Sequence, residues 1–412
     1  MNLYEELTWR GCIAQVTDPE LENVLNNESL TFYLGIDPTA DSMHVGHLFG
    51  LINCRRLQDA GHKPIILVGG ATGMIGDPSG KSDERNLLDE AAINHNVEGL
   101  SKQIKKIISA KMVNNYDWTK KYDVISFLRD IGKHFNINNM LAKESVKSRL
   151  DNGISFTEFA YQVMQGLDYL HLYRDENCTL QVGGTEQWGN IVAGMDLIRK
   201  QMGHEAKVYG LNWPLITKSD GSKFGKTAGG AVWLDPLRTT PYEFYQFWLN
   251  QTDGDALMYL RKFTFLNFNE ITSIENEMEE APHLRSAQKA LGKAMTIMVH
   301  SEEAFNDAVR ISTALFTWDI KALKATEIEV VFKGVPSIDS SEITLLDALV
   351  ETKLASSKSE ARRLVTGNAV AINGDKIKEV DYVLTSIDFI DDVFAVIRKG
   401  KKAYAIVKKA KL

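Results

Sequence analysis

Two histidines three residues apart are the first candidates for chemistry. They lie in the segment YLGIDPTADSMHVGH, in which Gly35 closes a short apolar run and His44 and His47 open a run with helical spacing. A glycine lets a nucleotide approach the backbone, and the N–H groups and positive dipole of a helix N-terminus suit phosphate. A polyphosphate site is therefore expected. A pair of surface histidines, or a metal site that would need a third ligand, are the alternatives.

A glycine-rich segment with two lysines is the second candidate. The sequence TKSDGSKFGKTAGG contains Lys223, Lys226 and Thr227. Two lysines three residues apart, beside hydroxyl groups, can close over a triphosphate and cancel charge that develops in a transition state. Taken alone, the segment is equally typical of a basic surface loop. The segment DPSGKS, from Asp77, resembles the end of a P-loop, but Ile75 occupies the position of the required first glycine, so a P-loop is not expected.

Two further groups of polar residues are spaced for ligand binding. Tyr161, Gln165 and Asp168 recur at helical spacing, so they share one helix face. Polar groups on such a face are costly unless they meet a polar ligand or one another, and both outcomes stay open. In QVGGTEQ, Gly184 allows close approach of a ribose and Glu186 can accept hydrogen bonds from its hydroxyls. A plain turn is the alternative.

An α/β sheet is needed to bring these groups together. Residues 31–36 and 64–68 read as strands, and residues 44–60 between them read as a helix. Strand, helix and strand at this separation predict a parallel sheet with ligands at the carboxyl ends of its strands. Three more elements are expected: strands at 179–182 and 207–210 and a helix at 190–202. The sum is a nucleotide-binding α/β domain.

The remainder of the chain contains a stretch of expected helices followed by a tail rich in basic residues. From residue 241 to about 323 only amphipathic helices are expected, for instance 302–315, and the Gly, Pro and Ser residues of 333–341 predict a linker. Residues 343–412 carry 13 Lys and Arg against 9 Asp and Glu, whereas the rest carries 34 against 45. In this tail Lys358, Arg362 and Arg363 share one helix face, which suits a nucleic-acid backbone, although a solvated basic surface would look the same.

Composition limits the class of protein. The chain has 412 residues, 44% of them hydrophobic and 25% charged, and a net charge of -7. These values are ordinary for a globular protein of two or three domains. Cys12, Cys54 and Cys178 lie far apart and in no metal-binding pattern, so no structural metal and a reducing compartment are expected. Neither a signal peptide nor a membrane span is recognised, and a cytoplasmic location is expected.

The motifs together resemble a known family. His44-Val45-Gly46-His47 resembles the HIGH signature of class I aminoacyl-tRNA synthetases, and KFGKT at 223–227 resembles their KMSKS signature. The segments FYLGIDPTADSMHVGH, LVGGATGMIGDPSGK, FTEFAYQVMQGLDYLHL, LQVGGTEQWGN and TPYEFYQFW resemble the bacterial tyrosyl-tRNA synthetases, and SKSEARRLVTGNAVAINGDKI resembles the ribosomal S-four-type RNA-binding domain that ends them.

The resemblance implies a fold and a division into domains. The expected class is α/β, with a Rossmann-like parallel-sheet catalytic domain at 1–220. The KMSKS-type loop and an α-helical anticodon-binding domain are expected at 221–325, a linker at 326–342, and a small α+β S-four-type RNA-binding domain at 343–412.

The resemblance also implies roles for individual residues. Tyr33 and Asp168 would bind a substrate phenol, and Asp77, Tyr161 and Gln165 its ammonium group. Gln181 and Gln187 would help to place that substrate. Implied ATP-binding residues are Gly35, Asp37, His44, His47, Lys81, Arg85, Gly184, Glu186 and Lys226. Implied catalytic residues are Thr39, His44, His47, Lys223, Lys226 and Thr227, and implied RNA-binding residues are Lys358, Arg362 and Arg363. Leu34, Gly50 and Glu186 depart from what many relatives have, which leaves their ribose contacts open.

The implied activity is that of a tyrosine–tRNA ligase. It would use ATP with Mg²⁺, tyrosine and tRNA(Tyr), without a membrane, as a homodimer with residues 124–146 near the interface. Two other functions stay open at this point. One is an adenylate-forming nucleotidyltransferase that acts on a small acid without tRNA, and the other is an RNA-binding protein that retains the fold without catalysis.

Overall fold

The computed structural model describes residues 1–79, 88–147, 149–150, 153–222, 224–227, 230–400 and 403–410, with only the backbone at Ser145, Lys226 and Thr227. The chain forms two compact units, Met1–Ser301 and Glu302–Leu412. Each unit has its own sheet and its own core, and each is described by itself.

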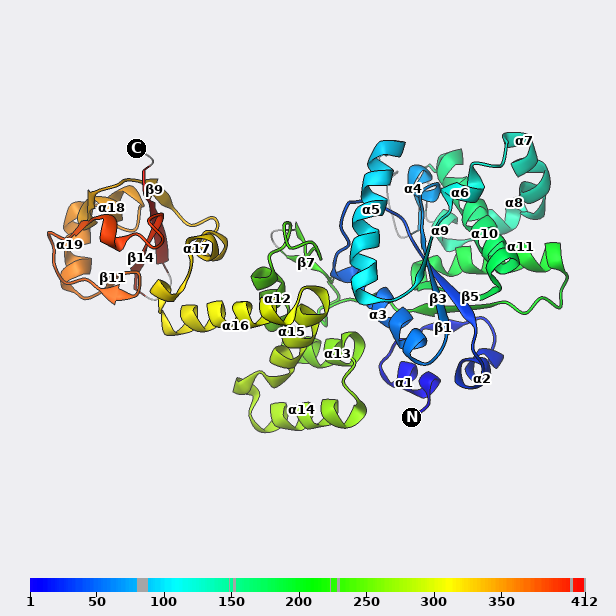
Figure 1. Ribbon diagram of the computed structural model, residues 1–412, viewed down its shortest axis with the longest axis horizontal. Coiled ribbons are helices and arrows are strands. Elements are labelled where there is room, and N and C mark those ends of the chain that lie inside the picture. The colour runs from blue at the N-terminus through cyan, green and yellow to red at the C-terminus, as the bar shows by residue number, and fades with distance from the viewer. Residues whose placement is uncertain are drawn as a thin grey trace. The chain divides into compact units, whose positions relative to one another are not determined.

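A sheet forms the centre of the first unit (Figure 1). It has six strands in the order β1-β6-β5-β2-β3-β4. Every neighbouring pair is parallel except β1 with β6. Nearly all residues of β3, β5 and β6 are buried, as expected for a sheet covered on both faces. The strands are β1 (Gln15–Val16), β2 (Thr31–Ile36), β3 (Lys63–Val68), β4 (Lys111–Asn114), β5 (Cys178–Gly184) and β6 (Tyr209–Trp213).

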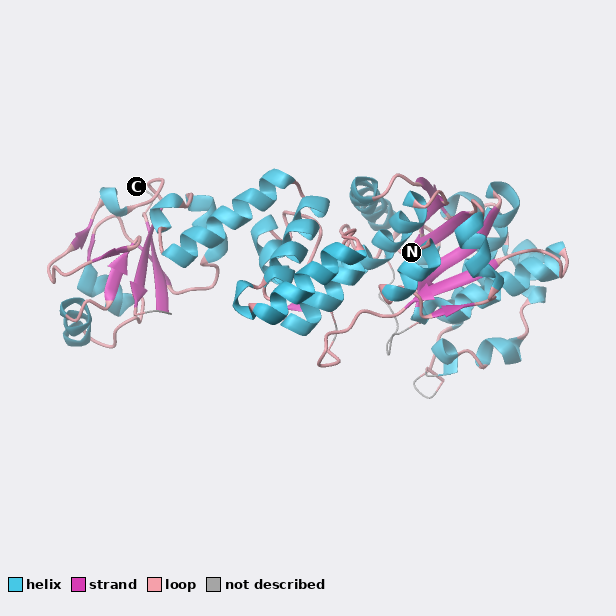
Figure 2. Ribbon diagram, turned by 90° about the horizontal axis from the view of Figure 1, so that it is seen from below, coloured by secondary structure: helices cyan, strands magenta, loops and turns pink. Residues whose placement is uncertain are grey.

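Helices pack on both faces of this sheet (Figure 2). Helices α3 (Val45–Asp59) and α5 (Glu90–Ile107) contact each other, and α3 packs on β3. Helices α10 (Phe156–Glu176) and α11 (Trp188–Met202) pack on each other and on β5. The predicted α/β class and its strand, helix and strand unit are confirmed. The strand predicted at 207–210 was misplaced, because the pairing with β5 runs from Tyr209 to Trp213.

The order of the strands determines where a ligand can bind. From β2 the chain adds β3 and then β4 on one side, and afterwards places β5 and β6 on the other side of β2. The connections therefore reverse direction between β2 and β5. In parallel sheets such a switch point opens a crevice outside the carboxyl ends of the two strands. Here these ends are Ile36 and Gly184.

A helical part completes the first unit. Its helices are α12 (Pro241–Leu249), α13 (Asp253–Phe263), α14 (Phe268–Glu280) and α15 (Ser286–Val299). Helix α12 begins with a capping box between Thr240 and Glu243 and has Pro241 in its first turn, a strong local signal for a helix start. The expectation of helices in this stretch is confirmed.

In its described residues the second unit contains four α-helices, a five-stranded sheet of order β12-β11-β14-β15-β9, and a two-stranded sheet of β10 (Ile343–Thr344) and β13 (Val383–Leu384). The helices are α16 (Glu302–Thr317), α17 (Ala325–Val331), α18 (Leu345–Glu351) and α19 (Lys358–Thr366). The strands are β9 (Ser337–Asp339), β11 (Val370–Ile372), β12 (Asp375–Lys376), β14 (Phe394–Lys399) and β15 (Ala403–Lys408). The stretch predicted as a linker instead supplies β9, whose backbone pairs with β15, and most of α17. The domain boundaries themselves stay a prediction.

Within the first unit, a buried arginine ties the sheet to the helical part. Arg56, on α3, is 4% exposed. Its Nη2 donates to the carbonyl oxygens of Lys262 at 2.9 Å and Thr264 at 2.8 Å, at the end of α13. Its Nη1 donates to Asn53 Oδ1 at 2.7 Å. Carbonyl groups at a helix C-terminus lack partners within the helix, so Arg56 supplies a donor to Lys262 and, together with Arg10 Nη1 at 3.2 Å, to Thr264.

Replacing Arg56 with alanine should lower the free energy of unfolding by about 3 kcal/mol, because buried carbonyls lose charged donors. The neighbouring Arg55, whose side chain is 39% exposed, serves as a control. Arg55→Ala should cost less than about 0.5 kcal/mol. Denaturant unfolding measures both values, and equal losses would show that the links to α13 contribute nothing.

Candidate active site

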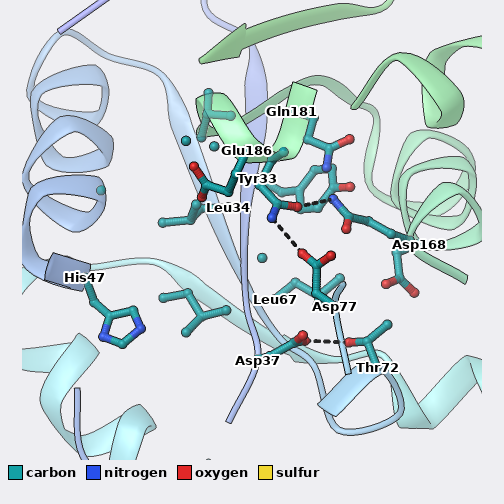
Figure 3. Close-up of a pocket in the computed structure, with 18 of the residues that line it drawn as sticks. Tyr33, Leu34, Asp37, His47, Leu67, Thr72, Asp77, Asp168, Gln181 and Glu186 are labelled. Atoms are coloured by element: carbon teal, nitrogen blue, oxygen red, sulfur yellow. Dashed lines mark hydrogen bonds between the residues drawn. The ribbon is translucent and has the colours of Figure 1, made fainter. Parts of the chain in front are cut away.

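A cavity of about 240 Å³ opens at the switch point of the first sheet. Asp168 lies at one end of it and His47 at the other (Figure 3). The predicted site residues that the structure brings together on its wall are Tyr33, Gly35, Asp37, Thr39, His47, Asp77, Tyr161, Gln165, Asp168, Gln181, Gly184, Glu186 and Gln187. They come from β2, β5 and α10 and from the segments that follow β2, β3 and β5.

The remaining predicted residues of this site either lie outside the cavity wall or belong to parts of the chain that the structure does not describe. His44 is not part of the cavity wall, but its ring centroid lies 4.0 Å from that of His47. Lys81, Arg85 and Lys223 lie outside the described residues, and the side chains of Lys226 and Thr227 do as well. Their roles therefore stay predictions.

Asp168 is a buried carboxylate held by two donors that the sequence analysis missed. Asn115 Nδ2 donates to Asp168 Oδ2 at 2.9 Å, and Trp118 Nε1 donates to Asp168 Oδ1 at 2.8 Å. Burial raises the pKa of Asp168 to about 7, and the hydrogen bonds from Asn115 and Trp118 act in the opposite direction. Asn115 directly follows β4, and Trp118 lies in the short helix α6 (Tyr116–Thr119) that comes next. Recognising that strand would have placed them at the carboxyl edge of the sheet.

Four polar atoms of the cavity wall are buried without a hydrogen-bond partner among the described residues. They are Tyr33 Oη, Gln165 Oε1, Gln181 Oε1 and Glu186 Oε2. Leaving a buried polar group unpaired costs about 1–3 kcal/mol. Several such groups around one cavity indicate a polar ligand that supplies the missing partners. Burial, followed by the charge of Asp168, raises the pKa of Tyr33 well above its ordinary value, so this hydroxyl keeps its proton.

Two further carboxylates are fixed along the cavity. Asp37 accepts hydrogen bonds from Tyr161 Oη at 2.8 Å and from Thr72 Oγ1 at 2.7 Å. Asp77 accepts one from Gln187 Nε2 at 2.7 Å (Figure 3). Charged acceptors held in place in this way favour a ligand with a positive group. Thr72 was not among the predicted residues.

The histidines form the start of α3. His44 Nδ1 accepts from Gly46 N at 3.1 Å, and His47 Nδ1 accepts from His44 N at 3.2 Å. A ring nitrogen that accepts cannot carry the proton, so the neutral rings carry it on Nε2. The pair therefore sets two N–H donors at the positive end of a helix, which suits anionic oxygens.

The cavity has an apolar wall beside a polar one. Leu34, Gly50 and Trp213 line it. A Cβ at Gly50 would lie 3.1 Å from Trp213 Cζ2, so the glycine lets the indole pack against α3. A Cβ at Gly184 would lie 2.3 Å from a carboxylate oxygen of Glu186, so this glycine lets Glu186 turn back over the strand end.

A parallel sheet with a polar cavity at its switch point and a helix N-terminus at one end defines a nucleotide-binding α/β protein. Comparison with known proteins refines this class. Residues 25–317 match the family model for class I tRNA synthetases (W and Y), and residues 327–407 match the tyrosine–tRNA ligase SYY-like C-terminal domain. The chain belongs to this class I family and, by its full-length relatives, to the tyrosine–tRNA ligases.

Those relatives match over nearly the whole chain. A tyrosine–tRNA ligase from Listeria welshimeri is 53% identical over 416 residues, which cover 99% of each chain. The tyrosine–tRNA ligase 1 of Bacillus cereus is 52% identical over 418 residues, covering 99% of this chain and 100% of that one. The structure of a C-terminally truncated mitochondrial tyrosyl-tRNA synthetase from Aspergillus nidulans has a TM-score of 0.68 at 30% identity, covering 76% of this chain and 94% of that one.

Among the described residues, no helix combines the length and apolar composition that a membrane crossing requires. No group of three or more His, Cys, Asp or Glu residues within them is arranged to hold a metal ion.

The raised pKa of Asp168 predicts a pH dependence. An aspartic acid in an unfolded chain has a pKa of about 3.9. Because the folded protein holds the proton up to about pH 7, raising the pH between these values disfavours the folded state. Asp168→Asn removes this proton, so the variant should gain about 2 kcal/mol relative to wild type between about pH 5 and pH 7. Denaturant unfolding of the ligand-free proteins at each pH measures the difference, and parallel stability curves would contradict the prediction.

Proposed function

We propose that this protein activates tyrosine with ATP, giving tyrosyl-adenylate and pyrophosphate, and transfers tyrosine to the 3′-terminal adenosine of tRNA(Tyr). One observation carries the proposal most directly. The cavity contains a buried acid, Asp168, together with the unpaired buried hydroxyl of Tyr33. A phenol would donate to the first and accept from the second.

The same geometry would distinguish tyrosine from phenylalanine. Phenylalanine has no hydroxyl, so it would leave the Tyr33 hydroxyl buried without a partner and Asp168 without its ligand. Rejection of phenylalanine by tyrosyl-tRNA synthetases is the standard instance of this effect. At the other end of the substrate, Asp77 would bind the ammonium group with Tyr161 and Gln165.

ATP would occupy the end of the cavity nearer to α3. A Cβ at Gly35 would meet nothing within 4 Å, so the strand end leaves open space for the nucleotide. Glu186 and the backbone of Gly184 would bind the ribose. The Nε2–H groups of His44 and His47 would donate to phosphate oxygens. The other residues proposed on the triphosphate side are Asp37, Thr39, Lys81, Arg85, Lys223, Lys226 and Thr227. ATP would enter as its Mg²⁺ complex, with the ion carried by the phosphates.

The first chemical step needs no general base. A carboxylate oxygen of tyrosine attacks the α-phosphorus, a new P–O bond forms, and the bond to the pyrophosphate oxygen breaks with pyrophosphate as the leaving group. A carboxylate is already a nucleophile at neutral pH. The protein would therefore accelerate the step by orienting the two substrates and by donating to the phosphoryl oxygens as their charge develops.

In the second step a ribose hydroxyl of the tRNA attacks the activated carbonyl carbon, and AMP leaves. Contacts to the tRNA backbone are proposed for Lys358, Arg362 and Arg363, which are all exposed on α19. Lys358 Nζ lies 2.6 Å from Asp347 Oδ1, so its charge is partly compensated within the unit. A cytoplasmic location is part of the proposal.

A homodimer is proposed through the region 124–146. Large apolar side chains in it are exposed: Val124 by 72%, Ile125 by 68%, Ile137 by 57% and Leu128 by 50%. Several exposed apolar side chains within one short stretch favour burial against a partner. Sedimentation equilibrium should show a dimer, and a monomer at micromolar concentration would refute this part of the proposal.

The decisive assay is ATP–pyrophosphate exchange with a panel of amino acids, followed by charging of purified tRNA. Exchange that depends on tyrosine, together with charging of tRNA(Tyr), is the expected result. Exchange without charging would favour a nucleotidyltransferase that does not use tRNA. Absence of exchange with any amino acid would favour an RNA-binding protein without catalysis.

Removing the Tyr33 hydroxyl should change the affinity for tyrosine without lowering the free energy of unfolding. Tyr33→Phe should weaken tyrosine binding about tenfold and leave the free energy of unfolding unchanged or about 1 kcal/mol higher, because the hydroxyl lacks a partner without ligand. Tyr169 is a matched control, since its ring lies 5.4 Å from that of Tyr33 and its hydroxyl bonds to backbone carbonyls at 2.9 and 2.8 Å. Tyr169→Phe should lose stability and keep tyrosine affinity. Calorimetric titration and denaturant unfolding test both variants, and the reverse pattern would contradict the assignment.

A further inference from the structure

Phe224 lies in the chain between Lys223 and Lys226 and packs into an aromatic cluster. This cluster consists of Phe247, Trp248, Tyr259 and Phe263. The ring centroid of Phe224 lies 4.8 Å from Tyr259, 5.3 Å from Phe263, 5.6 Å from Phe247 and 5.8 Å from Trp248. One residue of the lysine loop, itself partly buried, therefore packs against the core of the helical part.

The aromatic cluster is a rigid site of attachment. Its members lie on α12 and α13 and are at most 8% exposed. They also pack on one another, for instance Trp248 on Phe263 at 5.2 Å. The segment that leads into the loop is fixed to α13 as well, because Ser219 N donates to Asp255 Oδ1 at 2.8 Å and Tyr259 Oη donates to the Thr217 carbonyl at 3.2 Å.

The segment that follows Phe224 is fixed to the start of α3. Gly225 has φ +80°, and a Cβ there would lie 2.9 Å from Val45 Cγ2, so only a glycine allows this approach. Farther along, Val45 N donates to the Val232 carbonyl at 3.0 Å, and Leu234 N donates to the Met43 carbonyl at 2.8 Å. The described residues of this segment thus contact both the helical part and the start of α3, which carries His44 and His47.

We propose that Phe224 is a positioning residue for adenylate formation. Its ring, held in the aromatic cluster, fixes the backbone of residues 224–227, which includes Lys226 and directly follows Lys223, and Gly225 directs that backbone against the start of α3. This inference rests on the proposed function, in which both lysines meet the triphosphate. A ring that only filled the core would affect stability. A ring that positions the loop affects the rate of the chemical step while tyrosine, bound at the other end of the cavity, keeps its affinity.

The test compares Phe224→Leu with Phe247→Leu in the full-length protein. Each variant removes one ring from the same aromatic assembly, but Phe247 lies on α12 and outside the loop. Misplacement of a reacting group by about 1 Å can cost about 10²-fold in rate, so Phe224→Leu should lower kcat for tyrosine-dependent pyrophosphate exchange by about that factor. Its KM and Kd for tyrosine should stay within about twofold. Phe247→Leu should keep kcat, and Phe224→Tyr, which keeps a ring, should restore most of it.

Three outcomes would contradict the positioning role of Phe224. Equal losses of kcat in Phe224→Leu and Phe247→Leu would overturn the proposal, because loss of core packing would then suffice. Wild-type kcat in Phe224→Leu would overturn it, because the ring would then not be needed for the chemical step. Loss of tyrosine binding together with kcat would also overturn it, because the whole site would then be disturbed. Failure of the proposed function is distinguishable, because the wild-type protein would then show no tyrosine-dependent exchange at all.

Discussion

The buried carboxyl group of Asp168 is the feature on which the rest of the site depends. Asp168 is buried on α10 and is tolerated because Asn115 and Trp118 each donate one hydrogen bond to it. Both donors follow β4, at the edge of the sheet, whereas Asp168 lies on a helix packed against β5. The parallel sheet is therefore needed to bring donors and acceptor together from segments about 50 residues apart in sequence.

The polar atoms of the cavity wall lower the stability of the ligand-free protein and allow it to recognise a ligand. Among the described residues, buried atoms of Tyr33, Gln165, Gln181 and Glu186 have no hydrogen-bond partner, which costs free energy in the ligand-free protein, and a ligand of matching polarity would supply the partners. Polar groups placed in this way discriminate more strongly than apolar walls, because a ligand that lacks a partner atom leaves them buried and unsatisfied. The switch point between β2 and β5 brings this recognition end and the histidine-bearing start of α3 to one cavity.

Much of this architecture was predictable from local patterns. The apolar run at 31–36 gave the bounds of β2, and helical spacing placed Tyr161, Gln165 and Asp168 on one face of α10. Strand β4 was missed because it has four residues and none is fully buried, so it lacks an apolar signature, and Asn115 and Trp118 were missed with it. The Pro and Gly residues before β9 suggested a linker. The strand itself was missed because it forms only by pairing with β15, which is distant in sequence. The pairing of Gly50 with Trp213 likewise requires the folded chain.

The most direct test of this account is calorimetric titration of the ligand-free protein with tyrosine and with phenylalanine, two ligands that differ by a single hydroxyl group. The account predicts saturable binding of tyrosine and, for phenylalanine, an affinity lower by at least about 10³-fold, because Asp168 and Tyr33 would stay buried without their partner. Binding of both amino acids with similar affinity would contradict it.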